Sequence, residues 1–303
     1  MPTNRPLILI TNDDSVFAPG LHLLIDYVKS MGDVIAIAPD APHSGQSSAI
    51  SVNKVLQINR HEDYNGAAIY SVNGTPVDCV KLGMHAVLDR RPDFILSGIN
   101  HGSNSGNSII YSGTMGAVLE GCMLGIPSIG YSFHSHNQAY SLEACREVVE
   151  KITSRVMEQG LPSDICLNVN IPKCSKVEGI KVTRAAHGFW TEEYAEYVDP
   201  HGKPFYWLTG KFHNVEPDNP ETDLYWTDRG YASVVPCRPD QSAVNEIGLI
   251  SDLLGIDLFY PSACRRPRRV SGMCGSMQGT WRNCRPIAGD DFHRASRCPW
   301  GMP

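Results

Sequence analysis

Short apolar runs alternate with longer amphipathic segments along the first part of the chain. Apolar residues fill positions 7–10 and 34–38, and residues 21–28 between them show the apolar spacing of a helix. Strand, helix and strand within so short a stretch form a βαβ unit, which makes both strands parallel in one sheet. The same pattern predicts strands at 94–96, 126–130 and 165–169 and helices at 115–124 and 142–156. We therefore expect an α/β fold over residues 5–175.

The composition of the sequence changes after residue 175. Aromatic residues crowd positions 180–236, with turn-forming residues between them, which favours hairpins or an extended arm. We therefore divide the chain into a core at 1–175, a β-rich extension at 176–258 that packs on this core, and an atypical tail at 259–303.

Charge separates the tail from the rest of the chain. The whole sequence has a net charge of −6, which disfavours duplex nucleic acid as a partner, since duplex binding needs a surplus of Lys and Arg. From Pro261 onward, however, it has eight Arg, two Asp and neither Lys nor Glu, without hydrophobic periodicity. This composition predicts a disordered tail, with a basic interaction arm as the alternative.

The composition predicts a soluble, cytoplasmic protein with free thiols. Its 42% hydrophobic and 19% charged residues are ordinary for a globular chain. No stretch approaches the ~20 apolar residues of a membrane helix, and the run at 7–10 is too short for a signal-peptide core. We therefore expect no membrane partner. Ten cysteines occur without a C-x-x-C pair, which predicts buried free thiols rather than zinc ligands.

Polar residues follow three of the predicted strands at the point where each strand ends. Asp13 and Asp14 come after the first strand, Ser44 and Gly45 follow the second, and Asn100 follows a later one. Ligands of parallel α/β sheets bind outside the carboxyl ends of the strands. We therefore expect these residues to meet at one edge of the sheet.

Asp13 and Asp14 are neighbouring carboxylates, which repel each other unless a positive charge lies between them. A hard divalent cation, Mg²⁺ or Mn²⁺, supplies that charge, prefers oxygen ligands and leaves positions for water and phosphate. The Ser44 hydroxyl and the Asn100 amide oxygen would complete its ligands. The alternative is that the two aspartates only cap the helix that begins near Pro19.

A segment rich in Gly, Ser and Asn at 102–107 leads into a second polar run at 111–114. Such a loop at the start of a helix presents backbone N–H groups and hydroxyls to an anion. We therefore expect phosphate to bind here. The predicted substrate-binding residues are Gly45, Asn104, Ser112, Gly113 and Thr114. Plain helix capping by Ser112 or Thr114 is the alternative, and the segment 74–78 is a weaker candidate for lining the same cleft.

Several familiar motifs are absent from the sequence. It has no G-x-x-x-x-G-K-[ST] P-loop, no G-x-S-x-G nucleophile elbow and no G-x-G-x-x-G dinucleotide fingerprint. A phosphate-receiving signalling domain also begins with paired acidic residues. It needs an acceptor Asp after a later strand, however, and no suitable Asp follows the strand at 94–96.

The remaining motifs stand in a fixed order along the chain. They are ITNDD at 10–14, APG at 18–20, APD at 38–40 with SG at 44–45, GTPVDCVKL at 74–82, SGIN at 97–100 with Gly102 and Asn104, YSGT at 111–114, LNVNIP at 167–172, and the stretch from TD at 222–223 to Pro236. Together they resemble the SurE survival-protein family over about residues 6–240.

The resemblance implies a Rossmann-like, three-layer α/β fold whose β-rich extension serves dimerisation, in a homodimer or homotetramer. It implies hydrolysis of nucleoside 5′- and 3′-monophosphates, with short polyphosphate as a further substrate of some members. It also implies one divalent cation per subunit, Mg²⁺ or Mn²⁺, held by the residues that match Asp13, Asp14, Ser44 and Asn100. The same four residues follow the ends of the predicted strands.

Asp13 and Asp14 are also the expected catalytic residues. We expect in-line attack of a water on the phosphomonoester, with the cation lowering the pKa of that water and either aspartate orienting or deprotonating it. A covalent aspartyl-phosphate is disfavoured, because one aspartate would then be the nucleophile while the other carried the metal.

Two features depart from the family. Ser15 stands where the family usually has Gly, and a side chain there is strained if the position needs a positive φ. The tail matches nothing in the family. The alternative function is therefore a SurE-like protein that binds phosphate or nucleotide but turns it over weakly.

Overall fold

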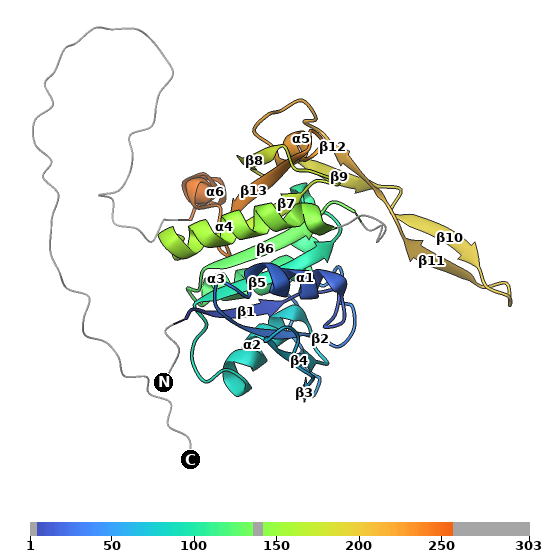
Figure 1. The fold of residues 1–303 in the computed structure, drawn as a ribbon. Coiled ribbons are helices and arrows are strands. Elements are labelled where there is room, and N and C mark those ends of the chain that lie inside the picture. Colours follow the sequence, from blue (N-terminus) through green and yellow to red (C-terminus); the bar gives the residue numbers. More distant parts are fainter. Residues whose placement is uncertain (1–4, 136–141, 257–303) are drawn as a thin grey trace, which may run out of the picture. The chain divides into compact units, whose positions relative to one another are not determined.

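A nine-stranded, mostly parallel sheet forms the centre of the protein (Figure 1). The computed structural model describes residues 5–135 and 142–256, so the predicted tail at 259–303 lies outside the described residues. In chain order the strands of this sheet are β1 (Leu7–Thr11), β2 (Asp33–Pro39), β3 (Ile58–Arg60), β4 (Ala68–Val72), β5 (Phe94–His101), β6 (Ser128–Phe133), β7 (Cys166–Ile171), β8 (Gly179–Val182) and β13 (Tyr231–Cys237). Their order in the sheet is β3-β4-β2-β1-β5-β6-β7-β13-β8.

Helices cover both faces of the sheet. They are α1 (Pro19–Val28), α2 (Pro76–Ala86), α3 (Gly113–Met123) and α4 (Arg146–Gln159). Successive side chains of β1 point to opposite faces: Ile8 and Ile10 belong to the apolar cluster that contains Leu21 of α1, and Leu9 belongs to the cluster that contains Val80 of α2. A strand covered on both faces is apolar throughout, which is why short continuous runs predict this architecture. The three-layer α/β fold is confirmed.

The strands and helices predicted in residues 5–175 are all present, with ends that differ by a few residues. The structure also contains β3, β4 and α2, which the sequence pattern did not predict. A capping box starts α2: the Thr75 hydroxyl accepts from the Asp78 N–H at 3.1 Å, and the Asp78 carboxylate accepts from the Thr75 N–H at 2.9 Å. The segment 74–78 is therefore the beginning of a helix, and its place in a substrate cleft stays a prediction.

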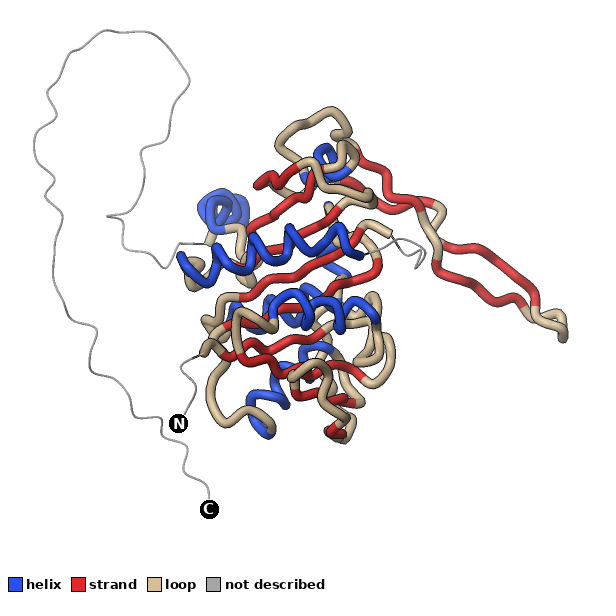
Figure 2. The backbone as a smooth tube through the Cα atoms, viewed as in Figure 1, coloured by secondary structure: helices blue, strands red, loops and turns tan. Residues whose placement is uncertain are grey.

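The extension is rich in β-structure, as predicted. It adds β9 (Gly188–Thr191), β10 (Tyr194–Val198), β11 (Pro204–Leu208), β12 (Lys211–Asn214) and the short helix α5 (Asp223–Thr227). The hairpin of β10 and β11 continues from the β9–β12 pair as an arm that projects away from the sheet (Figures 1 and 2). The chain then returns to the sheet, where β13 pairs antiparallel with β7 and parallel with β8.

The described residues fall into two units, with the boundary between Ser242 and Ala243. In the second unit the described residues include the helix α6 (Ile247–Leu254). The predicted division at residues 175 and 258 stays a prediction. No helix within the described ranges is long and apolar enough to span a membrane.

The cysteines that the structure describes are free thiols, as predicted. Cys79, Cys122, Cys145 and Cys166 are buried, and Cys174 and Cys237 are half-buried. The four cysteines of the tail lie outside the described residues.

Candidate metal and phosphate site

Asp13 and Asp14 lie directly after β1, at the edge where the parallel strands end. Asp13 is 3% exposed, and the Asp14 side chain is 18% exposed. The backbone N–H of His43 donates to the Asp13 carbonyl oxygen at 2.7 Å, which brings the segment after β2 against the aspartates. The backbone N–H of His101, at the end of β5, donates to Asp14 Oδ2 at 3.0 Å. Three strand ends therefore meet around the two carboxylates.

The two aspartates do not cap α1. Its N-cap is Ala18, and its first turn contains no acidic residue. The helix begins instead with Pro19, whose fixed φ and missing N–H suit the first helical position. The capping interpretation of Asp13 and Asp14 is therefore wrong.

Asp13 is a buried carboxyl group that lacks a basic partner within the described ranges. The Thr114 hydroxyl donates to Asp13 Oδ1. Burial raises the pKa of Asp13 to about 6; the charge of Asp14 adds to this rise, and the hydrogen bonds from Thr114 oppose it. A Cβ on Gly113 would lie 2.9 Å from the Asp13 Cβ, so this approach of α3 to the carboxylate requires glycine. A bound cation would supply the positive charge that Asp13 lacks.

The oxygen atoms around the aspartates suit a hard divalent cation. The Asn100 Nδ2 donates to the Gly102 carbonyl oxygen at 2.9 Å, which leaves Asn100 Oδ1 as a ligand atom. Ser44 is exposed and follows His43, the residue whose N–H is bound to Asp13. Carboxylate, amide and hydroxyl oxygens are the ligands that Mg²⁺ and Mn²⁺ prefer. Among the described residues, no group of three or more His, Cys, Asp or Glu is placed to hold a metal.

Helix α3 begins at the same edge of the sheet. Ser112 is its N-cap, because its hydroxyl oxygen accepts from the Met115 N–H at 3.0 Å. The capping alternative is therefore confirmed for Ser112. Its hydroxyl hydrogen still serves as a donor, and the first N–H groups of α3 favour an anion. The phosphate-binding roles of Ser112, Gly113 and Thr114 stay predictions.

The loop after β2 packs against the start of α3. The Ser47 N–H donates to the Tyr111 carbonyl oxygen at 3.0 Å, and a Cβ on Gly116 would lie 2.3 Å from the Ser47 carbonyl oxygen. Gly45 in this loop is exposed, with φ = +76°, a conformation that favours glycine. The loop that contains Ser44 and Gly45 is thereby fixed beside α3. The substrate contact predicted for Gly45 stays a prediction.

Asn104 is held by two asparagines of β7 for which the sequence pattern predicted no role. Its N–H donates to Asn170 Oδ1 at 2.8 Å, and its carbonyl oxygen accepts from Asn168 Nδ2 at 2.8 Å. Its own Nδ2 donates to Ser132 Oγ at 2.7 Å. The signal in the sequence is a polar residue at alternate positions of the buried strand β7, which places both on one face. Asn104 thus belongs to the framework of the loop, and its contact with substrate stays a prediction.

Ser15 adopts φ = +99°. L-residues with a side chain rarely adopt this conformation, whereas glycine adopts it readily. The Ser15 carbonyl oxygen accepts from Asn12 Nδ2 at 2.8 Å, which closes the turn that contains the two aspartates. The departure from the family at this position is therefore a strained residue beside the candidate metal ligands.

We expect Ser15→Gly to raise the free energy of unfolding by about 1 kcal/mol, because it relieves this strain at a smaller cost in unfolded-state entropy. The melting temperature, measured by circular dichroism, should rise by roughly 2–4 °C. Ser15→Ala is the matched control, since it removes the hydroxyl but keeps the Cβ. An equal rise for both variants would show that strain at φ is not the cause.

Comparison with known proteins identifies the family. The family model described as Survival protein SurE matches residues 8–192. The 5′-nucleotidase SurE of Phocaeicola vulgatus is 42% identical over 253 residues, covering 84% of this chain and 97% of that protein. The 5′-nucleotidase SurE of Christiangramia forsetii is 45% identical over 248 residues, covering 80% and 95%. The crystal structure of SurE from Aquifex aeolicus has a TM-score of 0.71 at 38% identity and covers 82% of this chain and 100% of that one. With its parallel sheet and its acidic strand end, the chain belongs to the SurE family.

Proposed function

We propose that this protein is a divalent-cation-dependent nucleotidase that hydrolyses nucleoside 5′- and 3′-monophosphates, and short polyphosphate, to release phosphate. The observation that carries the proposal is the buried Asp13 carboxylate at the start of α3, beside an Asp14 carboxylate that accepts from the His101 N–H at the end of β5. Relatives that are 42% and 45% identical over most of their length are named 5′-nucleotidases, which supports the same reaction class here.

The proposed roles follow from the chemistry of each group. Asp13, Asp14, Ser44 and Asn100 would hold one Mg²⁺ or Mn²⁺. Such a cation supplies positive charge to the phosphoryl oxygens and makes a nearby water more acidic. The Ser112 hydroxyl and the first N–H groups of α3 would bind the phosphate. Asp14, the more exposed of the two aspartates, would orient the attacking water and accept its proton.

Phosphate release from a panel of nucleotides tests this proposal. We expect AMP and other nucleoside monophosphates to be hydrolysed with Mn²⁺ or Mg²⁺, and hydrolysis to stop with a chelator and return when the cation is restored. Full activity in the presence of the chelator would contradict the proposed cation. Phosphate binding without turnover would instead favour the weakly active alternative.

We propose that the arm associates with a second copy of this chain. Its exposed apolar side chains include Tyr206 at 61%, Trp207 at 66% and Leu208 at 66% exposure, on a hairpin that projects from the sheet. Several large exposed apolar side chains gathered on one hairpin are typical of protein interfaces, and most homo-oligomers are symmetric dimers or multiples of them. Light scattering should give a dimeric or tetrameric mass, and Trp207→Glu should lower it. A wild-type monomer would contradict this proposal.

A further inference from the structure

The loop at 102–106 is fixed by hydrogen bonds from residues far away in the sequence. On the side of the sheet, Asn168 and Asn170 of β7 bind the backbone of Asn104. On the side of the extension, the Gly106 N–H donates to Asp223 Oδ2 at 2.8 Å. Asn168 and Asp223 are each 0% exposed, so these bonds are shielded from water. Buried side chains therefore bind the loop at its middle, Asn104, and at its C-terminal end, Gly106.

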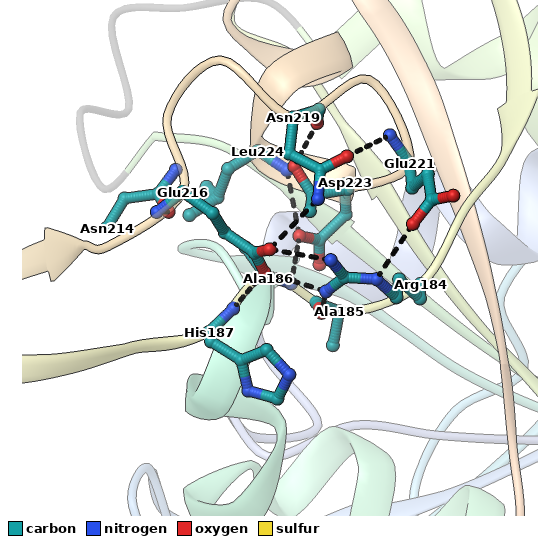
Figure 3. A network of polar contacts seen from close by, with 11 residues as sticks. Arg184, Ala185, Ala186, His187, Asn214, Glu216, Asn219, Glu221, Asp223 and Leu224 are labelled. Atoms are coloured by element: carbon teal, nitrogen blue, oxygen red, sulfur yellow. Dashed lines mark hydrogen bonds and ion pairs between the residues drawn. The ribbon is translucent and has the colours of Figure 1, made fainter. Parts of the chain in front are cut away.

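Asp223 links this loop to the base of the extension. Its Oδ1 accepts from the Ala186 N–H at 2.9 Å and from the Leu224 N–H at 2.8 Å, while Oδ2 accepts from Gly106. Figure 3 shows Asp223 beside the network in which Arg184 pairs with Glu216. A buried carboxylate is costly unless hydrogen bonds compensate it, and bonds of N–H groups to a charged oxygen are strong. Only Oδ2 reaches the loop.

The loop in turn orients a candidate metal ligand. The Gly102 carbonyl oxygen accepts from Asn100 Nδ2 at 2.9 Å, and the Gly102 N–H donates to the Phe133 carbonyl oxygen at 2.9 Å. The amide of Asn100 is thereby fixed with its nitrogen toward Gly102 and its Oδ1 available to a cation. Displacement of the loop would turn this amide or move Gly102 away from it.

We propose that Asp223 is a positioning residue of the metal site. It holds Gly106, so that the loop at 102–106 keeps the Asn100 amide oriented for the cation. This inference rests on the proposed function, because the cation is the one proposed there. The base of the extension, from which the arm projects, therefore helps to shape the metal site.

The test is Asp223→Asn. The variant keeps the size of the side chain and the oxygen that accepts from the Ala186 and Leu224 N–H groups. Its amide nitrogen, however, replaces the oxygen that accepts from the Gly106 N–H, so that two hydrogen-bond donors face each other. Residues that orient metal ligands typically change metal affinity by about 10- to 100-fold when replaced. We expect the Kd for Mn²⁺, measured without nucleotide from the electron paramagnetic resonance signal of free Mn²⁺, to rise by at least about tenfold. Amide hydrogen exchange within 100–106 should also become faster in the metal-free protein.

Glu216→Gln is the matched control. Glu216 belongs to the same polar network, where it binds Arg184 and the His187 N–H, but none of its hydrogen bonds reaches the loop at 102–106. Loss of the Glu216 charge weakens hydrogen bonds within the extension but leaves the bond from Gly106 to Asp223 in place. We expect the wild-type affinity for Mn²⁺ and wild-type exchange within 100–106.

A second variant tests the hydrogen bond between the loop and β7. Asn168→Asp keeps an oxygen for Asn170 Nδ2 and removes the donor to the Asn104 carbonyl oxygen. The same rise in Kd is expected, and this variant replaces the first if Asp223→Asn does not fold.

The outcomes separate the positioning role from the proposed function. Wild-type Mn²⁺ affinity and exchange in a folded Asp223→Asn protein would overturn the positioning role while leaving the nucleotidase proposal intact. An equal loss of affinity in Glu216→Gln would also overturn it, since the effect would then be a general weakening of the extension. A wild-type protein that binds no Mn²⁺ and releases no phosphate from AMP would remove the proposed function and the inference together.

Discussion

Asp13→Asn should reduce phosphate release from AMP at least about a hundredfold, on the order of 3 kcal/mol of activation free energy. The substitution keeps the shape of the side chain and its contact with Thr114, but it removes one of the two negative charges that would hold the cation. A cation bound by Asp14 and neutral oxygens alone has lower affinity and stabilises less charge in the transition state. The measurement is kcat/KM for AMP at saturating Mn²⁺.

The control for this variant removes the same charge at a distant surface position. Asp164 forms an ion pair with Arg238 at 2.9 Å, and both side chains are about 60% exposed. Asp164→Asn should keep wild-type kcat/KM, since exposed pairs contribute little. If Asp13→Asn hydrolyses AMP as fast as Asp164→Asn, the metal-site assignment is wrong.

Gly20→Ala should strongly destabilise the protein. A Cβ at this position would lie 2.0 Å from the Ile99 carbonyl oxygen and 3.0 Å from its carbonyl carbon. Both atoms belong to the backbone of β5, which does not move as a side chain does. We expect a loss of about 3 kcal/mol in the free energy of unfolding, because overpacking against backbone forces α1 and β5 apart. The melting temperature should fall by roughly 6–12 °C.

The clash also lies next to the candidate site, because Ile99 precedes Asn100. We therefore expect Gly20→Ala to bind Mn²⁺ more weakly even below its melting temperature. Gly248→Ala is the control: Gly248 lies inside α6, and an added Cβ has no heavy atom within 4 Å. Alanine is the better helix former, so this variant should be neutral or slightly stabilised. A melting temperature for Gly20→Ala equal to that of Gly248→Ala would show that α1 is able to shift away from β5.

The sequence predicts the core well because its strands are covered on both faces. β1, β2, β5, β6 and β7 each appear as short apolar runs between helical segments, and all five are in the sheet. Strand ends with polar residues then predict where a ligand binds, since parallel strands end at one edge. β3 was not predicted because it is a short edge strand without a buried side chain. β4 was not predicted because its apolar run at 68–70 is brief and ends at Ser71.

The sequence by itself determined the α/β core, the acidic strand end and the family, because each depends on residues that are neighbours in the chain or recur at a fixed spacing. Tertiary structure decided the conformation of Ser15 and the partners of the loop at 102–106. The bond from Gly106 to Asp223 spans 117 residues, and the bond from Asn168 to Asn104 spans 64. No local periodicity encodes such pairs, since they form only when the folded sheet brings β7 and the base of the extension against the end of β5.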